Sequence, residues 1–167
     1  NLILTNASGS LDKDHCPKGT VGLITDFDGN IPHPQIGYPN FVSMTHILSD
    51  ELNTIIKTLA KEQKIQVKEG PYYANQGPGY ETKIQIDTLR SNNFKYVGMS
   101  SMPEAMVAAE LGIKTACLTL ATNNCIGTND DKSLPPTHAE VKQAGKDDRD
   151  MIRLLCLISN QFSKKNK

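Results

Sequence analysis

Gly77-Pro78-Gly79-Tyr80-Glu81-Thr82 lies between a run that favours a β-strand, Gly70–Asn75, and a stretch with helical spacing that begins at Glu81. The glycines and the proline favour a sharp turn between these two elements. Short apolar runs also alternate with amphipathic stretches along the rest of the chain, which is typical of a sheet with helices packed against it. The segment therefore predicts an α/β fold.

The strands of this sheet are predicted from short apolar runs, several of which show no alternation. Continuous apolar runs are expected for strands that are covered on both faces. We predict a mixed, largely parallel central sheet flanked by helices, in a single domain over residues 1–167, because no linker or repeat divides the chain. The predicted strands are Leu2–Thr5, Val21–Thr25, Gly70–Asn75, Lys95–Met99 and Ile113–Leu120.

Helices are predicted where apolar residues recur every three or four positions. The last of them begins at Thr137, which is expected to form a capping box with Glu140, and it bends or breaks near Gly145. By contrast, Asp26–Asn40 contains several prolines and glycines, so we predict a loop that cannot join a central strand. The predicted helices cover Ile47–Leu59, a segment from Glu81 to beyond Leu89, Pro103–Leu111, and Thr137–Ile158.

The composition excludes several classes of function. The chain has 167 residues with 18 acidic and 18 basic side chains, so it lacks the positive surplus of a nucleic-acid-binding domain. No apolar run is long enough to span a membrane, and no secretion signal opens the sequence. The four cysteines have no zinc-ligand spacing, which favours buried, reduced thiols in a cytoplasmic protein without a metal; they are Cys16, Cys117, Cys125 and Cys156.

Polar residues stand at the ends of several predicted elements. Glu81 opens a helix, and Asn123 follows the strand Ile113–Leu120 at its carboxyl end, where α/β sheets bind ligands. Each has a structural alternative, because the helix dipole favours a carboxylate at position 81 and asparagine forms turns at strand ends. Ser100 could instead simply cap the helix that follows it, and His138 could be a solvated residue in the first turn of the last helix.

The order of the polar motifs resembles the purine nucleoside phosphorylases of the trimeric class. The resemblance implies phosphate-dependent cleavage of a purine nucleoside to free base and ribose 1-phosphate, a pentosyltransferase (glycosyltransferase) reaction of purine salvage. It also implies a cytoplasmic homotrimer that uses inorganic phosphate as co-substrate and needs no cofactor or metal. The similar segments are Asn6-Ala7-Ser8-Gly9, Gly77–Thr82, Val97–Ser100, Pro103-Glu104 and Ala121–Asn123.

The resemblance makes Glu81 and Asn123 the predicted catalytic residues. Glu81 would accept a hydrogen bond from N1–H of a 6-oxopurine, and Asn123 would donate near N7. An amide at that place stabilises the negative charge of the departing base more in the transition state than in the ground state. Tyr80 would lie against the base.

The sugar and the phosphate have their own implied contacts. Tyr72 and Met99 match residues near the ribose, and His138 matches a histidine that reaches the 5′-hydroxyl group. Ser100 would donate to phosphate. The turn Ala7-Ser8-Gly9 would bring its backbone close to phosphate and sugar, with the backbone of Ala7 on the phosphate.

Glu81 and Asn123 together predict a preference for inosine, guanosine and their deoxy forms over adenosine. A 6-aminopurine has no N1–H, so an ionised Glu81 would face a lone pair. The related methylthioadenosine phosphorylases have Asp at the position of Asn123 and lack the Glu of Gly77–Thr82. A phosphorylase with altered base specificity of this kind is the first alternative.

A non-catalytic relative or inactive fragment that binds purines is the second alternative. The family's Gly-rich phosphate loop and Arg-x-His segment have no counterpart in the sequence, and a buried-strand pattern already begins at Leu2, so we expect an N-terminally truncated chain. The loop Asp26–Phe41 is shorter than in the family and has an aspartate-rich start where a histidine is expected. Tyr38 is the candidate for the aromatic residue that reaches the neighbouring subunit.

Overall fold

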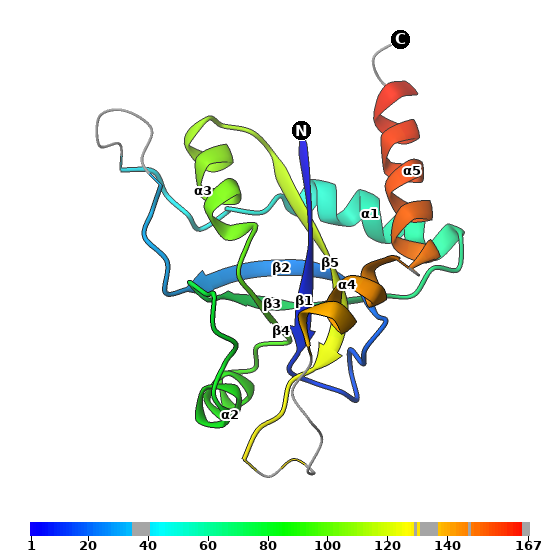
Figure 1. Cartoon of the computed structure of the whole chain (residues 1–167). Helices are drawn as coiled ribbons and strands as arrows, with labels where there is room; N and C mark the ends of the chain where they lie inside the picture. Colours follow the sequence, from blue (N-terminus) through cyan, green and yellow to red (C-terminus); the bar gives the residue numbers. More distant parts are fainter. Residues whose placement is uncertain (35–40, 129, 131–136, 147, 165–167) are drawn as a thin grey trace.

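The computed structural model describes residues 1–34, 41–128, 130, 137–146 and 148–164. Its strands close into a barrel in the order β1-β4-β3-β2-β5 (Figure 1). The pairs β1–β5, β2–β3 and β3–β4 are parallel, and the pairs β1–β4 and β2–β5 are antiparallel. The strands are β1 (Leu2–Ser10), β2 (Val21–Gly29), β3 (Val67–Ala74), β4 (Tyr96–Gly98) and β5 (Thr115–Asn124).

Helices surround this barrel, so the predicted mixed, largely parallel α/β fold is confirmed. Helices α1 and α5 pack against each other on one side, where α1 also contacts β5, whereas α3 contacts β1, β2 and β5 (Figure 1). None of the described helices is long and apolar enough to cross a membrane. The helices are α1 (Asp50–Glu62), α2 (Lys83–Ser91), α3 (Met102–Glu110), α4 (His138–Lys146) and α5 (Arg149–Lys164).

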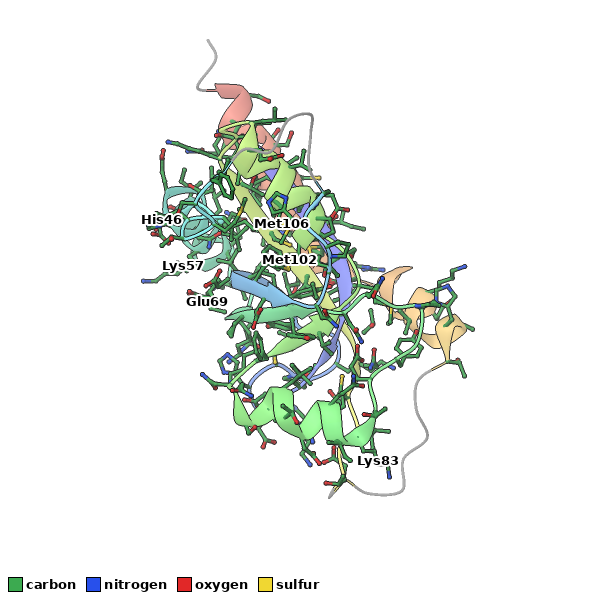
Figure 2. All side chains as sticks on the ribbon, turned by 90° about the vertical axis from the view of Figure 1, so that its left-hand side faces the viewer. His46, Lys57, Glu69, Lys83, Met102 and Met106 are labelled. Atoms are coloured by element: carbon green, nitrogen blue, oxygen red, sulfur yellow. The ribbon has the colours of Figure 1, made fainter. Side chains whose placement is uncertain are left out.

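Apolar faces of the helices build the core. Leu52 and Ile56 of α1 and Leu154 of α5 are almost fully buried against β2 and β5. Met102 and Met106 of α3 are also buried and pack in the cluster that holds the strand tyrosines (Figure 2). Removal of such buried side chains costs about 2–5 kcal/mol each, so these faces fix where each helix docks.

The predicted loop Asp26–Asn40 begins later than expected, because β2 continues through Gly29. Phe27 pairs with Tyr72 of β3, and their rings meet edge to face at 5.4 Å between centroids. Pairing with β3 and this aromatic contact outweigh the turn signals, and Pro32 is the first residue that cannot donate to a strand. Tyr38 lies outside the described residues.

Several predicted boundaries also differ from the structure. Helix α1 begins at Asp50, after the N-cap Ser49, and not at Ile47. Strands β1 and β5 are longer than predicted, so Ala7-Ser8-Gly9 and Asn123 belong to strands. Helix α2 begins at Lys83 and not at Glu81, because Thr82 is the N-cap and forms a capping box with Gln85. The C-terminal helix does break near Gly145, as predicted: α4 ends at Lys146, and Asp148 Oδ1 accepts from the amides of Asp150 and Met151 at 2.9 and 3.1 Å and starts α5 anew.

Two further sequence predictions concern side chains near the C-terminus. The predicted capping box at Thr137 depends on the Glu140 side chain, which lies outside the described part of the structure. Cys156 is exposed, so the prediction that it is buried was wrong, whereas Cys16, Cys117 and Cys125 are buried. The apolar neighbours of Cys156 face the core from other sides of α5, which sequence neighbours alone do not reveal.

Candidate functional site

A cavity of about 290 Å³ lies beside β4 and the paired carboxyl ends of β1 and β5. Gly9 of β1 pairs with Val97 of β4 on one side and with Asn123 of β5 on the other, so three strands meet at one residue. We call this space the strand-end cavity. Its lining residues are Asn6, Ala7, Ser8, Gly9, Tyr80, Glu81, Val97, Gly98, Met99, Ser100, Thr122, Asn123, Cys125, His138 and Val141.

All but one of the predicted site residues line this cavity. The exception is Tyr72, which is fully buried behind it, with its hydroxyl against Gly98 and near Ser100. That hydroxyl has no hydrogen-bond partner among the described residues, and burial raises the pKa of Tyr72 well above its usual range. The structure therefore brings the predicted residues together, while their roles stay predictions.

Asn123 is held by a bulge between β1 and β5. Ser8 pairs with Ala121 and Gly9 with Asn123, which leaves Thr122 as an extra, buried residue. The Thr122 hydroxyl lies 3.1 Å from the Ser8 carbonyl oxygen and 3.1 Å from Asn123 Oδ1, and it has one proton to donate to either of these two acceptors. Asn123 Oδ1 lies against this hydroxyl, so the Nδ2 group of Asn123 is the donor left for a ligand.

Glu81 is held by a residue that the sequence did not single out. Asn75, directly after β3, donates from Nδ2 to Glu81 Oε1 at 3.0 Å. Glu81 precedes the N-cap of α2, so its side chain is free of the helix and points along the cavity wall. Gly77 supports this turn, because it has φ of 69° and an added Cβ would lie 2.7 Å from Met99 Sδ.

A polar network underlies the floor of the cavity. Asn6 Nδ2 donates to Ser101 Oγ at 2.8 Å, and the Thr119 hydroxyl contacts both Asn6 Oδ1 and, at 2.7 Å, Ser8 Oγ. Ser101 has φ of 73°, a left-handed conformation that costs a residue with a side chain about 1–2 kcal/mol. The network holds β1, β5 and the start of α3 in one register beneath the cavity. Its signal in the sequence is weak, since Asn6 and Thr119 are two among several small polar residues of β1 and β5, and nothing local distinguishes them.

Ser100 stands at the positive end of a helix. It directly precedes Ser101, the N-cap residue of α3, and the Ser101 side chain makes no capping bond. Helix N-termini attract anions through their free amides and their dipole. Tyr80 and Met99 lie at the cavity mouth with 50% and 37% of their surfaces exposed.

Cys125 forms part of the wall, and burial raises the pKa of its thiol to about 12. The thiol therefore stays protonated at neutral pH and is a poor nucleophile. Arg90 braces this wall: it donates to the carbonyl oxygens of Cys125 at 2.7 Å and Leu11 at 2.9 Å, and to Asp130 at 2.8 Å. Within the described residues, no cluster of three or more His, Cys, Asp or Glu side chains is arranged to hold a metal ion.

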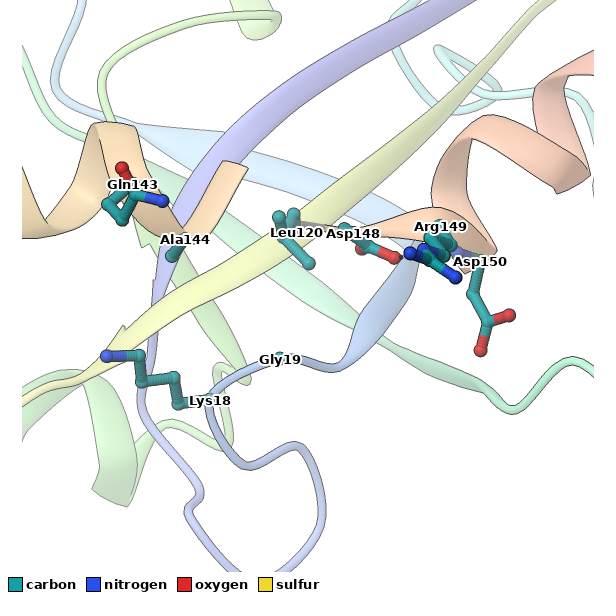
Figure 3. A pocket seen from close by; sticks show the side chains of 8 residues that line it. All are labelled: Lys18, Gly19, Leu120, Gln143, Ala144, Asp148, Arg149 and Asp150. Carbon is teal, nitrogen blue, oxygen red and sulfur yellow. Dashed lines mark hydrogen bonds between the residues drawn. The ribbon is translucent and has the colours of Figure 1, made fainter. Parts of the chain in front are cut away.

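A larger cavity, of about 790 Å³, lies between β5 and the junction of α4 and α5 (Figure 3). We call it the helix-junction cavity. It contains none of the predicted site residues, and Asp148, one of its carboxylates, already caps α5. Its lining residues are Lys18, Gly19, Leu120, Gln143, Ala144, Asp148, Arg149 and Asp150.

Comparisons with known proteins agree with the motifs. The family model described as the phosphorylase superfamily matches residues 1–157. Purine nucleoside phosphorylase 1 of Geobacillus stearothermophilus is 33% identical over 98% of this chain and 61% of its own length, and that of Bacillus subtilis is 32% identical over 85% and 54%.

A solved structure of schistosome purine nucleoside phosphorylase in complex with hypoxanthine matches 94% of this chain and 59% of its own length. Its TM-score is 0.83 at 25% sequence identity. The chain thus spans between 54% and 61% of the length of these relatives. Sequence, fold and comparisons agree that this chain belongs to the phosphorylase superfamily.

Proposed function

We propose that the protein containing this chain is a purine nucleoside phosphorylase that cleaves 6-oxopurine nucleosides. One observation carries this proposal: Asn123 and Glu81 face the same cavity, and each has one polar atom engaged by a neighbour. Thr122 contacts Asn123 Oδ1 and Asn75 donates to Glu81 Oε1. One amide donor and one carboxylate acceptor are thus left for a flat, polar ligand.

The proposed chemistry uses both groups on the base. The oxygen of Glu81 that Asn75 does not engage accepts from N1–H, and Asn123 Nδ2 donates to N7. A phosphate oxygen bonds to C1′ of the sugar while the bond from C1′ to N9 breaks, and its electron pair passes to the purine. Donation at N7 strengthens as this charge develops, which lowers the barrier.

Phosphate and sugar occupy the remaining wall in this proposal. Ser100 and the positive end of α3 bind phosphate together with the backbone of Ala7, and Met99 and His138 contact the sugar. The proposal includes no cofactor and no metal. It places the protein in the cytoplasm as a homotrimer, as the family resemblance implies.

The relatives support the proposal through their names. Those compared above are named purine nucleoside phosphorylases, and the schistosome enzyme is described in complex with hypoxanthine, a 6-oxopurine. Since the chain covers about three fifths of their length, the whole protein must supply the rest of the phosphate site.

The test is inosine turnover by the full-length protein, with and without phosphate. We expect phosphate-dependent release of hypoxanthine and ribose 1-phosphate, with kcat/KM for inosine about 100-fold or more above that for adenosine. Turnover without phosphate would indicate a hydrolase. A preference for methylthioadenosine would support altered base specificity, and hypoxanthine binding without turnover would support the non-catalytic relative.

A further inference from the structure

Asn75 connects two walls of the strand-end cavity. Its backbone N–H donates to the Gly98 carbonyl oxygen at 2.7 Å, which ties the end of β3 to the end of β4. Its side-chain Nδ2 donates to Glu81 Oε1 at 3.0 Å. The residue is half-buried and does not itself line the cavity, so it acts on any ligand through Glu81.

The direction of the Asn75 amide is fixed from both ends. Oδ1 accepts from the backbone N–H of Gln76 at 2.9 Å, so Nδ2 must face Glu81 as a donor. A donor at this place defines Glu81 Oε1 as an acceptor. Oε2 makes no hydrogen bond to the described residues, so it is the oxygen available to a ligand.

We infer that Asn75 is the positioning residue that sets base specificity, by fixing Glu81 as an acceptor for a ring N–H donor. This inference rests on the proposed function and extends it. The ligand class is a purine with an N–H beside an oxo group, whereas a purine with a lone pair at that ring position places acceptor against acceptor. Such a mismatch leaves a polar group of the site unpaired and is strongly discriminating.

The Asn75→Asp substitution replaces the Nδ2 donor that faces Glu81 with an oxygen, and it hardly changes the shape of the side chain. Its Oδ1 still accepts from the Gln76 amide, but a carboxylate now faces Glu81 at hydrogen-bond distance. Two carboxylates that close hold one proton, which has two places to sit. On the new aspartate it donates to Glu81 Oε1, as Asn75 does; on Glu81 Oε2 it donates instead to the N1 lone pair of a 6-aminopurine. Because the variant can take up the second arrangement, its preference for an N–H donor falls.

Calorimetric binding of hypoxanthine and adenine to the full-length protein, at one neutral pH, tests the inference. Asn75→Ala should weaken hypoxanthine about 10-fold and leave adenine within about 2-fold, as expected for loss of one charge-assisted hydrogen bond. Asn75→Asp should lower the hypoxanthine-to-adenine affinity ratio about 100-fold, with adenine binding improved. Asn160→Asp, on the exposed side of α5, is the matched control and should keep the wild-type ratio.

Glu81→Gln and the double variant Asn75→Ala/Glu81→Gln complete the design. The double variant should bind hypoxanthine no more weakly than Glu81→Gln alone, because Asn75 acts through Glu81. An unchanged ratio in both Asn75 variants, or equal weakening of both bases, would overturn the inference even if Glu81→Gln abolished the preference. If the wild type shows no preference and Glu81→Gln changes nothing, the proposed base recognition itself is wrong.

Discussion

The strand-end cavity and the helix-junction cavity differ in what holds their polar groups. At the strand-end cavity, Asn123 and Glu81 come from strand ends and turns, and each is oriented by a neighbouring side chain. At the helix-junction cavity, the larger of the two, Arg149 and Asp150 are exposed side chains at a helix start. Its one oriented carboxylate, Asp148, is held by the backbone amides that it caps at the start of α5. A group that is already oriented loses little entropy when it binds a ligand, so orientation marks a binding site better than volume does.

The largest difference between the two cavities is expected when one polar side chain is removed from each and the activity of the two variants is compared. Asn123→Ala should lower kcat/KM for inosine about 100- to 1,000-fold in the full-length protein, because a transition-state donor is lost. Arg149→Ala should stay within about 3-fold of the wild type, since a cation at a helix N-terminus adds nothing favourable. Steady-state kinetics of both variants decides: equal losses would contradict the assignment of the site.

Glycines of the two cavities give a second contrast, in stability. An added Cβ at Gly98 would collide with the Tyr72 hydroxyl and lie 3.3 Å from the Ala7 carbonyl oxygen. Gly98→Ala should therefore lower the free energy of unfolding by about 2–3 kcal/mol through overpacking.

Gly19 of the helix-junction cavity has φ of 89° but open space around it. Gly19→Ala should cost only about 1 kcal/mol, from the left-handed backbone conformation alone. Urea unfolding of the two variants measures both values. A Gly98→Ala variant as stable as Gly19→Ala would mean that the Tyr72 side chain can move away from the strand-end cavity.

The smallest expected effect is on stability at low pH, and it concerns Asp130, which binds the Arg90 side chain that supports the cavity wall at Cys125. The Gly127 amide and then Arg90 hold the pKa of Asp130 below its usual value of 3.8. A lowered pKa in the folded state means that ionised Asp130 stabilises the fold at pH values above about 4, and that this is lost as pH falls through the lower folded value. Asp130→Asn should cost about 1 kcal/mol at neutral pH.

Thermal unfolding between pH 7 and pH 3 checks this prediction. The difference between wild type and Asp130→Asn should shrink as pH falls, because both side chains become neutral. A difference that stays constant over this range would mean that packing, and not the charge of Asp130, braces the wall.

Much of the site followed from the motifs because their residues are close together in the chain. Tyr80 and Glu81 lie in one turn, and Met99 and Ser100 follow one strand. The supporting residues were missed for the opposite reason. Thr119 and Ser8 are 111 residues apart in the sequence, and Arg90 and Asp130 are 40 residues apart. No local sequence pattern predicts contacts between residues so far apart.

Boundaries failed where contacts between elements outweighed local signals. The prolines and glycines of Asp26–Asn40 indicated a loop, yet pairing with β3 and the ring contact of Phe27 with Tyr72 extend β2 to Gly29. Glu81 looked like the first residue of a helix, but Thr82 and Gln85 cap each other and exclude it. That shift matters, since it frees the Glu81 side chain for Asn75.

The sequence by itself determined the α/β class, the family resemblance and the kinds of polar group at the strand ends, because these depend on local periodicity and on motifs of a few residues. Only the tertiary structure decided how those groups are aimed. The bulge that aims Asn123 and the amide that holds Glu81 arise where separate strands meet. Their directions come from register and hydrogen-bond geometry between distant segments, which a linear pattern does not contain.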